Sequence, residues 1–155
     1  MQARLSGRTP TLAEVRGAVL EIRRAKSMTP APDAPNRRSA GSFFKNPVVS
    51  EADWAALGNA AGEAAPRFPA PPGQVKVPAA WLIERAGFSR GDQRGAVGIS
   101  TRHTLALVNL GGASASELLA FADEISARVH GRFGLSLQSE PVFVGFDATP
   151  PAKVR

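Results

Sequence analysis

The sequence predicts a single-domain α+β fold in which a small, mainly antiparallel sheet is covered by about four helices. A length of 155 residues suits one domain with a core of its own. Apolar residues recur every three or four positions in some segments and alternate in others, which are the patterns of helices and strands. The 15 glycines and 13 prolines indicate many turns, but a hydrophobic share of 43% is too high for a disordered chain.

Four segments have the features of helices. They are residues 10–26, 50–61, 79–88, and a longer helix that starts at Ser114 and ends at Gly131 or Gly134. Thr11 and Glu14 have the spacing of a capping box, and Ser50 with Asp53 repeats that spacing at the second helix. These caps predict where the helices begin.

Strands are expected where apolar residues alternate between turn signals. They are predicted at 41–49 with a break at Pro47, at 96–99 and 104–109, and at 135–137 and 141–146 as one interrupted strand. The Pro-rich segments 28–39 and 62–73 predict loops. Four residues inside the predicted elements are expected to pack in the core: Phe43, Phe44, Trp81 and Leu82.

The charge balance points to an anionic partner. Nineteen Lys and Arg against 13 Asp and Glu give a net charge of +6, which suits nucleic acid, an anionic lipid or a phosphorylated metabolite. The chain has no cysteine and only two histidines, so neither disulfide chemistry nor a metal site is expected. No apolar run is long enough to span a membrane, and we expect a cytoplasmic protein without a membrane partner.

Common nucleotide-binding fingerprints such as G-x-G-x-x-G are absent from the sequence. Four ordered motifs instead stand out: residues 41–47 (GSFFKNP), 76–83 (KVPAAWLI), 103–109 (HTLALVN) and 137–145 (LQSEPVFVG). In this order and spacing they resemble the carboxy-terminal, substrate-binding domain of the UDP-N-acetylenolpyruvoylglucosamine reductases. These enzymes are also called UDP-N-acetylmuramate dehydrogenases and belong to peptidoglycan precursor synthesis.

This resemblance implies a domain organisation and cofactors. Residues 1–10 are then a remnant of a preceding region, 11–146 the substrate-binding domain, and 147–155 a flexible tail. In the family, NADPH reduces FAD, and the reduced flavin passes hydride to the enolpyruvyl double bond of UDP-N-acetylenolpyruvoylglucosamine. The resemblance places the FAD site outside this chain, so we expect the chain alone to be inactive.

The resemblance also implies catalytic roles for Ser42 and Glu140. Hydride addition leaves carbanion character beside the carboxylate, so the site needs a proton donor there, which the family match assigns to Ser42, with Glu140 as the nearby acid. Lys45 is one candidate for lowering the cost of the Ser42 alkoxide. The alternatives are a turn hydroxyl and a solvated carboxylate. Pro141 departs from the family, which usually has an aliphatic residue there, and this puts the position of Glu140 in doubt.

Four further residues match family positions that contact the substrate: Lys26, Lys45, Asn46 and His103. A diphosphate and a carboxylate need cations and amide donors, which these side chains supply. The competing interpretations are that Lys26 favours its own helix end, that Asn46 forms a turn before Pro47, and that His103 is a polar strand-end residue.

Two other functions remain open from the sequence. One is a standalone domain that binds a UDP-sugar without reducing it. The other is a basic nucleic-acid-binding domain, which the sequence favours less because the basic residues are spread along the chain and no recognised motif gathers them. We therefore expect no nucleic-acid partner.

Overall fold

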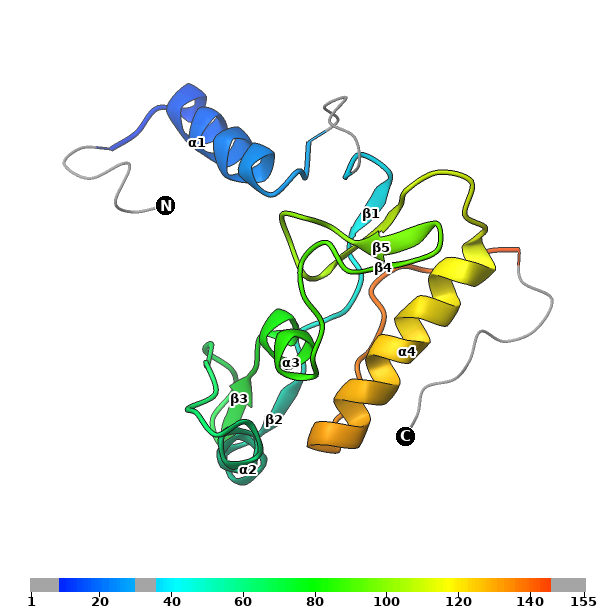
Figure 1. Cartoon of the computed structure of the whole chain (residues 1–155). Helices are drawn as coiled ribbons and strands as arrows, with labels where there is room; N and C mark the ends of the chain where they lie inside the picture. The colour runs from blue at the N-terminus through cyan, green and yellow to red at the C-terminus, as the bar shows by residue number, and fades with distance from the viewer. Residues whose placement is uncertain (1–8, 30–35, 146–155) are drawn as a thin grey trace.

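The computed structural model describes residues 9–29 and 36–145 (Figure 1). Within these residues the helices are α1 (Leu12–Ala25), α2 (Glu51–Ala61), α3 (Ala79–Arg85) and α4 (Ala115–Phe133). The strands are β1 (Ser39–Ser42), β2 (Val48–Ser50), β3 (Gln74–Lys76), β4 (Gln93–Arg94), β5 (Val97–Ile99) and β6 (Ala106–Asn109). These elements confirm the predicted α+β class. The predicted tail and most of the predicted amino-terminal remnant lie outside the described residues.

Capping side chains set the helix starts that the sequence predicted. In α1 the Thr11 hydroxyl accepts the Glu14 backbone N–H, and the Glu14 carboxylate accepts the Thr11 backbone N–H, which completes a capping box. The same box forms at the start of α4 between Ser114 and Glu117. α4 ends where Gly134 adopts a left-handed conformation with φ of 68°.

The strands form two separate antiparallel sheets. The four-stranded sheet has the order β1-β6-β5-β4, and β2 pairs with β3 in a second sheet of two strands. The sequence predicted one strand over 41–49 with a break at Pro47. The break is real, but β1 on one side joins the first sheet and β2 on the other joins the second, so the segment connects two sheets.

The predicted interrupted strand near the carboxyl end is wrong as far as the structure describes it. Residues 135–145 form no strand; Ser139 makes one isolated bridge with Phe44, and Phe146 lies outside the described residues. The Phe43 N–H, which could continue the pairing, donates instead to the Leu105 carbonyl. Beyond it, Val142 and Val144 are 87% and 86% exposed, so their apolar character does not reflect a buried strand.

The core lies where α4 crosses the four-stranded sheet and contacts α2 and α3 (Figure 1). The side chains of Ile125 and Val129 on α4 and of Leu82 and Ile83 on α3 are fully buried. Phe43, Phe44, Trp81 and Leu82, which the sequence assigned to packing, are all buried. None of the described helices is long and apolar enough to cross a membrane.

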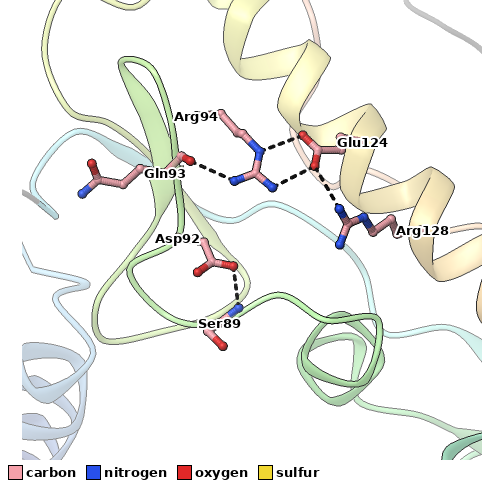
Figure 2. A network of polar contacts seen from close by, with 6 residues as sticks. All are labelled: Ser89, Asp92, Gln93, Arg94, Glu124 and Arg128. Carbon is pink, nitrogen blue, oxygen red and sulfur yellow. Dashed lines mark hydrogen bonds and ion pairs between the residues drawn. The ribbon is translucent and has the colours of Figure 1, made fainter.

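An ion-pair network fastens the β4–β5 hairpin to α4 (Figure 2). The Arg94 guanidinium lies 3.0 Å from a carboxylate oxygen of Glu124, and the Arg128 guanidinium is 3.9 Å from the same oxygen. Asp92 accepts the Ser89 backbone N–H at 2.9 Å and shapes the turn before β4. The pairs are partly exposed and fix the hairpin position more than they add to stability.

Helix α1 differs from the other helices because it projects away from the core (Figure 1). Ala18 is its only buried residue, and Leu12 is 89% exposed. The apolar face that predicted the helix is therefore largely uncovered within the described part of the chain. Arg23 in its last turn nevertheless lines a pocket together with residues of β1.

Candidate functional site

A pocket of about 650 Å³ lies between the end of α1 and strand β1. Its lining comes from four parts of the chain: the end of α1 and the turn after it, the segment that leads into and forms β1, the ends of β5 and β6, and the segment after Leu137. The residues that matter to the argument are Arg23, Ser27, Asn36, Arg37, Ser42 and Glu140. Segments far apart in sequence thus meet at one hollow.

Ser42 reaches this pocket because it ends β1. Its backbone pairs with Ala106 of β6, and the next residue, Phe43, donates its N–H to the Leu105 carbonyl at 2.7 Å. The Phe43 and Phe44 rings are buried and pack edge to face, with centroids 5.1 Å apart. These two rings anchor the segment in the core and leave the half-buried Ser42 at the pocket.

Glu140 is brought to the same pocket by antiparallel pairing. Its backbone N–H donates to the Phe43 carbonyl at 2.8 Å, and the Lys45 N–H donates to the Gln138 carbonyl at 2.9 Å. Backbone N–H groups point to opposite sides at successive residues of an extended segment. The backbone nitrogen of residue 141 therefore points away from the segment that contains Phe43. Pro141 can therefore stand there without costing a bond, and it does not displace the Glu140 backbone from the pairing.

The pocket lining contains both positively and negatively charged side chains. Arg23 and Arg37 supply the cations in its lining, and Glu140, whose side chain is exposed, supplies a carboxylate. Among residues 9–29 and 36–145, no group of three or more acidic or histidine side chains is placed to hold a metal ion. The arrangement suits an anionic organic ligand beside a hydroxyl and a carboxylate.

Lys26 and His103 do not line the pocket, but they lie close enough to each other to interact. Partial burial lowers the pKa of His103 below its ordinary value, and the positive charge of Lys26 lowers it further. The Glu84 carboxylate opposes this effect, and it also accepts a hydrogen bond of 2.6 Å from the Thr104 hydroxyl. A neutral His103 is thus favoured beside the exposed Lys26.

Lys45 and Asn46 also lie outside the pocket lining. Lys45 is exposed. The Asn46 side-chain oxygen accepts the Ala79 backbone N–H at 2.9 Å, at the first turn of α3. Asn46 therefore has a structural role through its side-chain oxygen. Its side-chain nitrogen is the atom that could contact a ligand.

The decisive comparison is with protein families. The family model described as "UDP-N-acetylenolpyruvoylglucosamine reductase, C-terminal domain" matches residues 33–144, which include β1, Ser42 and Glu140. The chain belongs to this family. The resemblance inferred from the four motifs is therefore confirmed.

Curated relatives agree with this family assignment. The chain is 50% identical over 140 residues to UDP-N-acetylenolpyruvoylglucosamine reductase of Thermobifida fusca, covering 86% of the chain and 39% of that relative. It is 47% identical over 135 residues to the reductase of Azoarcus sp., covering 87% of the chain and 37% of that relative. The chain therefore spans less than two fifths of the length of these relatives.

Two pocket residues of this reductase C-terminal domain were missed by the sequence analysis. Arg23 was not among the residues proposed for the site from the sequence, although it lines the pocket. Asn36 fell in a segment interpreted as a Pro-rich loop, yet it is only 6% exposed and also lines the pocket. An isolated asparagine has no local pattern that reveals a buried role, because its partners are distant in sequence.

Proposed function

We propose that this chain is the substrate-binding and proton-donating part of a reductase that acts on UDP-N-acetylenolpyruvoylglucosamine and forms UDP-N-acetylmuramate for peptidoglycan. The single observation that carries the proposal is the pocket shared by Ser42 and Glu140 with Arg23 and Arg37. The names of the relatives supply the substrate class. The proposal assigns the protein to the cytoplasm, where nucleotide sugars are available.

The chemistry assigned to the pocket is protonation. Reduction of an enolpyruvyl group adds hydride to one carbon of the double bond and a proton to the carbon beside the carboxylate. In the proposal the Ser42 hydroxyl donates that proton, and Glu140 acts as the neighbouring acid. Serine is a weak acid, so cations must stabilise the alkoxide; Arg23 and Arg37 line the pocket and fit this task better than Lys45, which does not.

Binding of the substrate uses the positive charge around the pocket. The diphosphate and carboxylate of a UDP-sugar require several cationic partners. We propose Arg23 and Arg37 inside the pocket, with Lys26, Lys45, Asn46 and His103 contributing at its approaches. Neutral His103 would donate or accept one hydrogen bond to an uncharged sugar hydroxyl or amide.

FAD and NADPH, which the family resemblance implies, do not fit the pocket. Among the described residues that line it, none carries an aromatic ring to cover a flavin, and Met28 is the one large apolar side chain. We assign both cofactors to another part of the whole protein. The chain itself would supply substrate binding and the proton.

The proposal is tested in a chimera that carries this chain in place of the corresponding 140 residues of the Thermobifida fusca relative. With Ser42→Ala, we expect bound flavin to be reduced by NADPH but not reoxidised by the enolpyruvyl substrate. The matched control is Ser39→Ala, which removes another hydroxyl of β1 that also lines the pocket. Unchanged reoxidation in Ser42→Ala would remove Ser42 from the chemistry.

A second candidate function is binding of a UDP-sugar without reduction. Arg23 and Arg37 in the pocket lining favour keeping it, because they can bind an anionic UDP-sugar whether or not reduction follows. Calorimetry of the 155-residue chain with UDP-N-acetylglucosamine separates binding from turnover. Binding by the chain together with an inactive chimera would support this second function.

A further inference from the structure

Asn36 joins two distant parts of the pocket wall. Its side-chain oxygen accepts the Thr101 backbone N–H at 3.0 Å, and its side-chain nitrogen lies 2.9 Å from the Thr101 hydroxyl and 3.4 Å from the Ser27 hydroxyl. Thr101 is 65 residues away along the chain and follows β5, whereas Ser27 lies in the turn after α1. One buried side chain therefore links α1 to the sheet.

An asparagine side chain suits this position because it carries both an acceptor and two donors. The acceptor satisfies the Thr101 backbone N–H, and the donors reach the hydroxyls of Thr101 and Ser27. An aspartate would place a charge at a site only 6% exposed, and an alanine would leave the Thr101 N–H without this acceptor. The three hydrogen bonds therefore require the asparagine carboxamide, which accepts and donates at once.

The link matters because α1 buries little of its own surface within the described residues. Only Ala18 of this helix is buried, and the helix projects from the core (Figure 1). Its last turn nevertheless presents Arg23 to the pocket. The turn is locally ordered: the Met28 N–H donates to the Arg23 carbonyl at 2.8 Å, and the Arg23 guanidinium donates to the Met28 carbonyl at 3.2 Å. A bond that fixes the position of Ser27 therefore also fixes the position of Arg23.

We propose that Asn36 is a positioning residue that fixes the α1 end of the pocket, and with it Arg23, over the strand that carries Ser42. This inference rests on the proposed function for its ligand, a UDP-sugar, but the link itself is a property of the unliganded chain. Asn36 acts through Arg23 and Ser27. It is not itself assigned a step in the reaction.

The first test is made without ligand, by amide hydrogen exchange. Asn36→Ala should speed exchange at Thr101 and through the turn that follows α1, while amides of α4 keep their protection. Asn59→Ala, at an exposed asparagine outside this pocket, is the matched control and should change neither. Unchanged exchange at Thr101 and at Met28 in Asn36→Ala would overturn the inference, whatever the chain binds.

The second test measures affinity for UDP-N-acetylglucosamine by calorimetry. Asn36→Ala should weaken binding by at least about fivefold because buried partners lose their bonds. Thr101 does not line the pocket, so Thr101→Val should weaken binding less than Asn36→Ala does. Thr101→Ser keeps the hydroxyl and should bind UDP-N-acetylglucosamine as tightly as the wild type. Equal affinity in all four proteins would overturn the inference. If Asn36→Ala does not fold, the Thr101 variants decide alone.

The two tests separate failure of this inference from failure of the proposed function. Wild-type chain that binds no UDP-sugar, together with faster exchange in Asn36→Ala, would contradict the proposed ligand and support the link. Tight binding by both wild type and Asn36→Ala would support the proposed ligand and contradict the positioning role of Asn36.

Discussion

Helices α1 and α4 begin with the same device but have different places in the molecule. Each starts with a hydroxyl residue followed three positions later by glutamate, and each forms the complete capping box. Yet α4 buries Phe121, Ala122, Ile125 and Val129, whereas α1 buries only Ala18. Local sequence thus decides where a helix starts, and packing decides how much that helix contributes to the stability of the fold.

The two helices also differ in how they are fixed. α4 is held by apolar burial and by the Arg94–Glu124 ion pair, which holds the β4–β5 hairpin against it (Figure 2). The end of α1 is held by hydrogen bonds through Asn36. The pocket therefore lies between a rigid sheet and a wall that a few polar contacts keep in place. Substitutions in α1 should therefore have little effect on α4 and the sheet.

The largest contrast is expected from truncating an apolar side chain on each helix. Ile125→Ala removes a fully buried side chain of α4 and should lower the free energy of unfolding by about 2 to 5 kcal/mol. Leu12→Ala removes a side chain of α1 that is 89% exposed and should change it by less than about 0.5 kcal/mol. Urea unfolding followed by circular dichroism measures both. Equal losses would show that α1 packs as firmly as α4.

A second contrast uses the two capping boxes. Ser114→Ala should cost about 1 kcal/mol of global stability, because α4 unfolds only with the core. Thr11→Ala removes the same kind of bond from α1 but should leave the urea midpoint unchanged, since this helix can fray by itself. Amide exchange should rise in α1 alone. A loss of global stability in Thr11→Ala would contradict the comparison.

A smaller effect is expected from pH at the edge of the site. Burial and Lys26 lower the pKa of His103 below its ordinary 6.5, so the folded chain binds this proton less readily than the unfolded chain. The stability contributed by neutral His103 is present above pH 6.5 and is lost as pH falls through the lowered pKa. His103→Gln should reduce this pH dependence. An NMR titration midpoint for His103 above 6.5 would contradict the expectation.

The smallest effect is expected at Pro141. Because the Glu140 N–H already makes the bond to Phe43, Pro141→Val should change stability by less than about 0.5 kcal/mol. Affinity of the chain for UDP-N-acetylglucosamine should also stay within about twofold, since the Glu140 backbone keeps its place. Calorimetry on both proteins measures this. A large gain in affinity would show that proline displaces the carboxylate.

The parts of the fold with local signals could be predicted from the sequence. The Thr11, Ser50 and Ser114 caps set the starts of three helices as expected. β4 was missed because Gln93 and Arg94 are both exposed and carry no apolar alternation. The predicted strand around Val142 failed for the opposite reason: its residues have strand character, but nothing in the described chain pairs with them.

The candidate site was predictable only where a motif carried it. Family motifs pointed to Ser42 and Glu140, and the structure places both at one pocket through the bridge between Phe44 and Ser139. Asn36 had no such motif, and its bond partner Thr101 is 65 residues away along the chain. Side chains whose role arises from distant contacts are not visible in a local pattern.

The connector between β1 and β2 has a consequence for which changes of length the protein tolerates. It carries no regular structure, yet Phe43 is bonded to Leu105, Asn46 to Ala79, and the Pro47 carbonyl accepts the Val77 N–H at 2.9 Å. One inserted residue here would throw these contacts out of phase and turn Ser42 relative to the second sheet. We therefore expect an insertion or deletion in this short irregular stretch to be poorly tolerated, because its length sets how the first sheet and the second sheet are placed relative to each other.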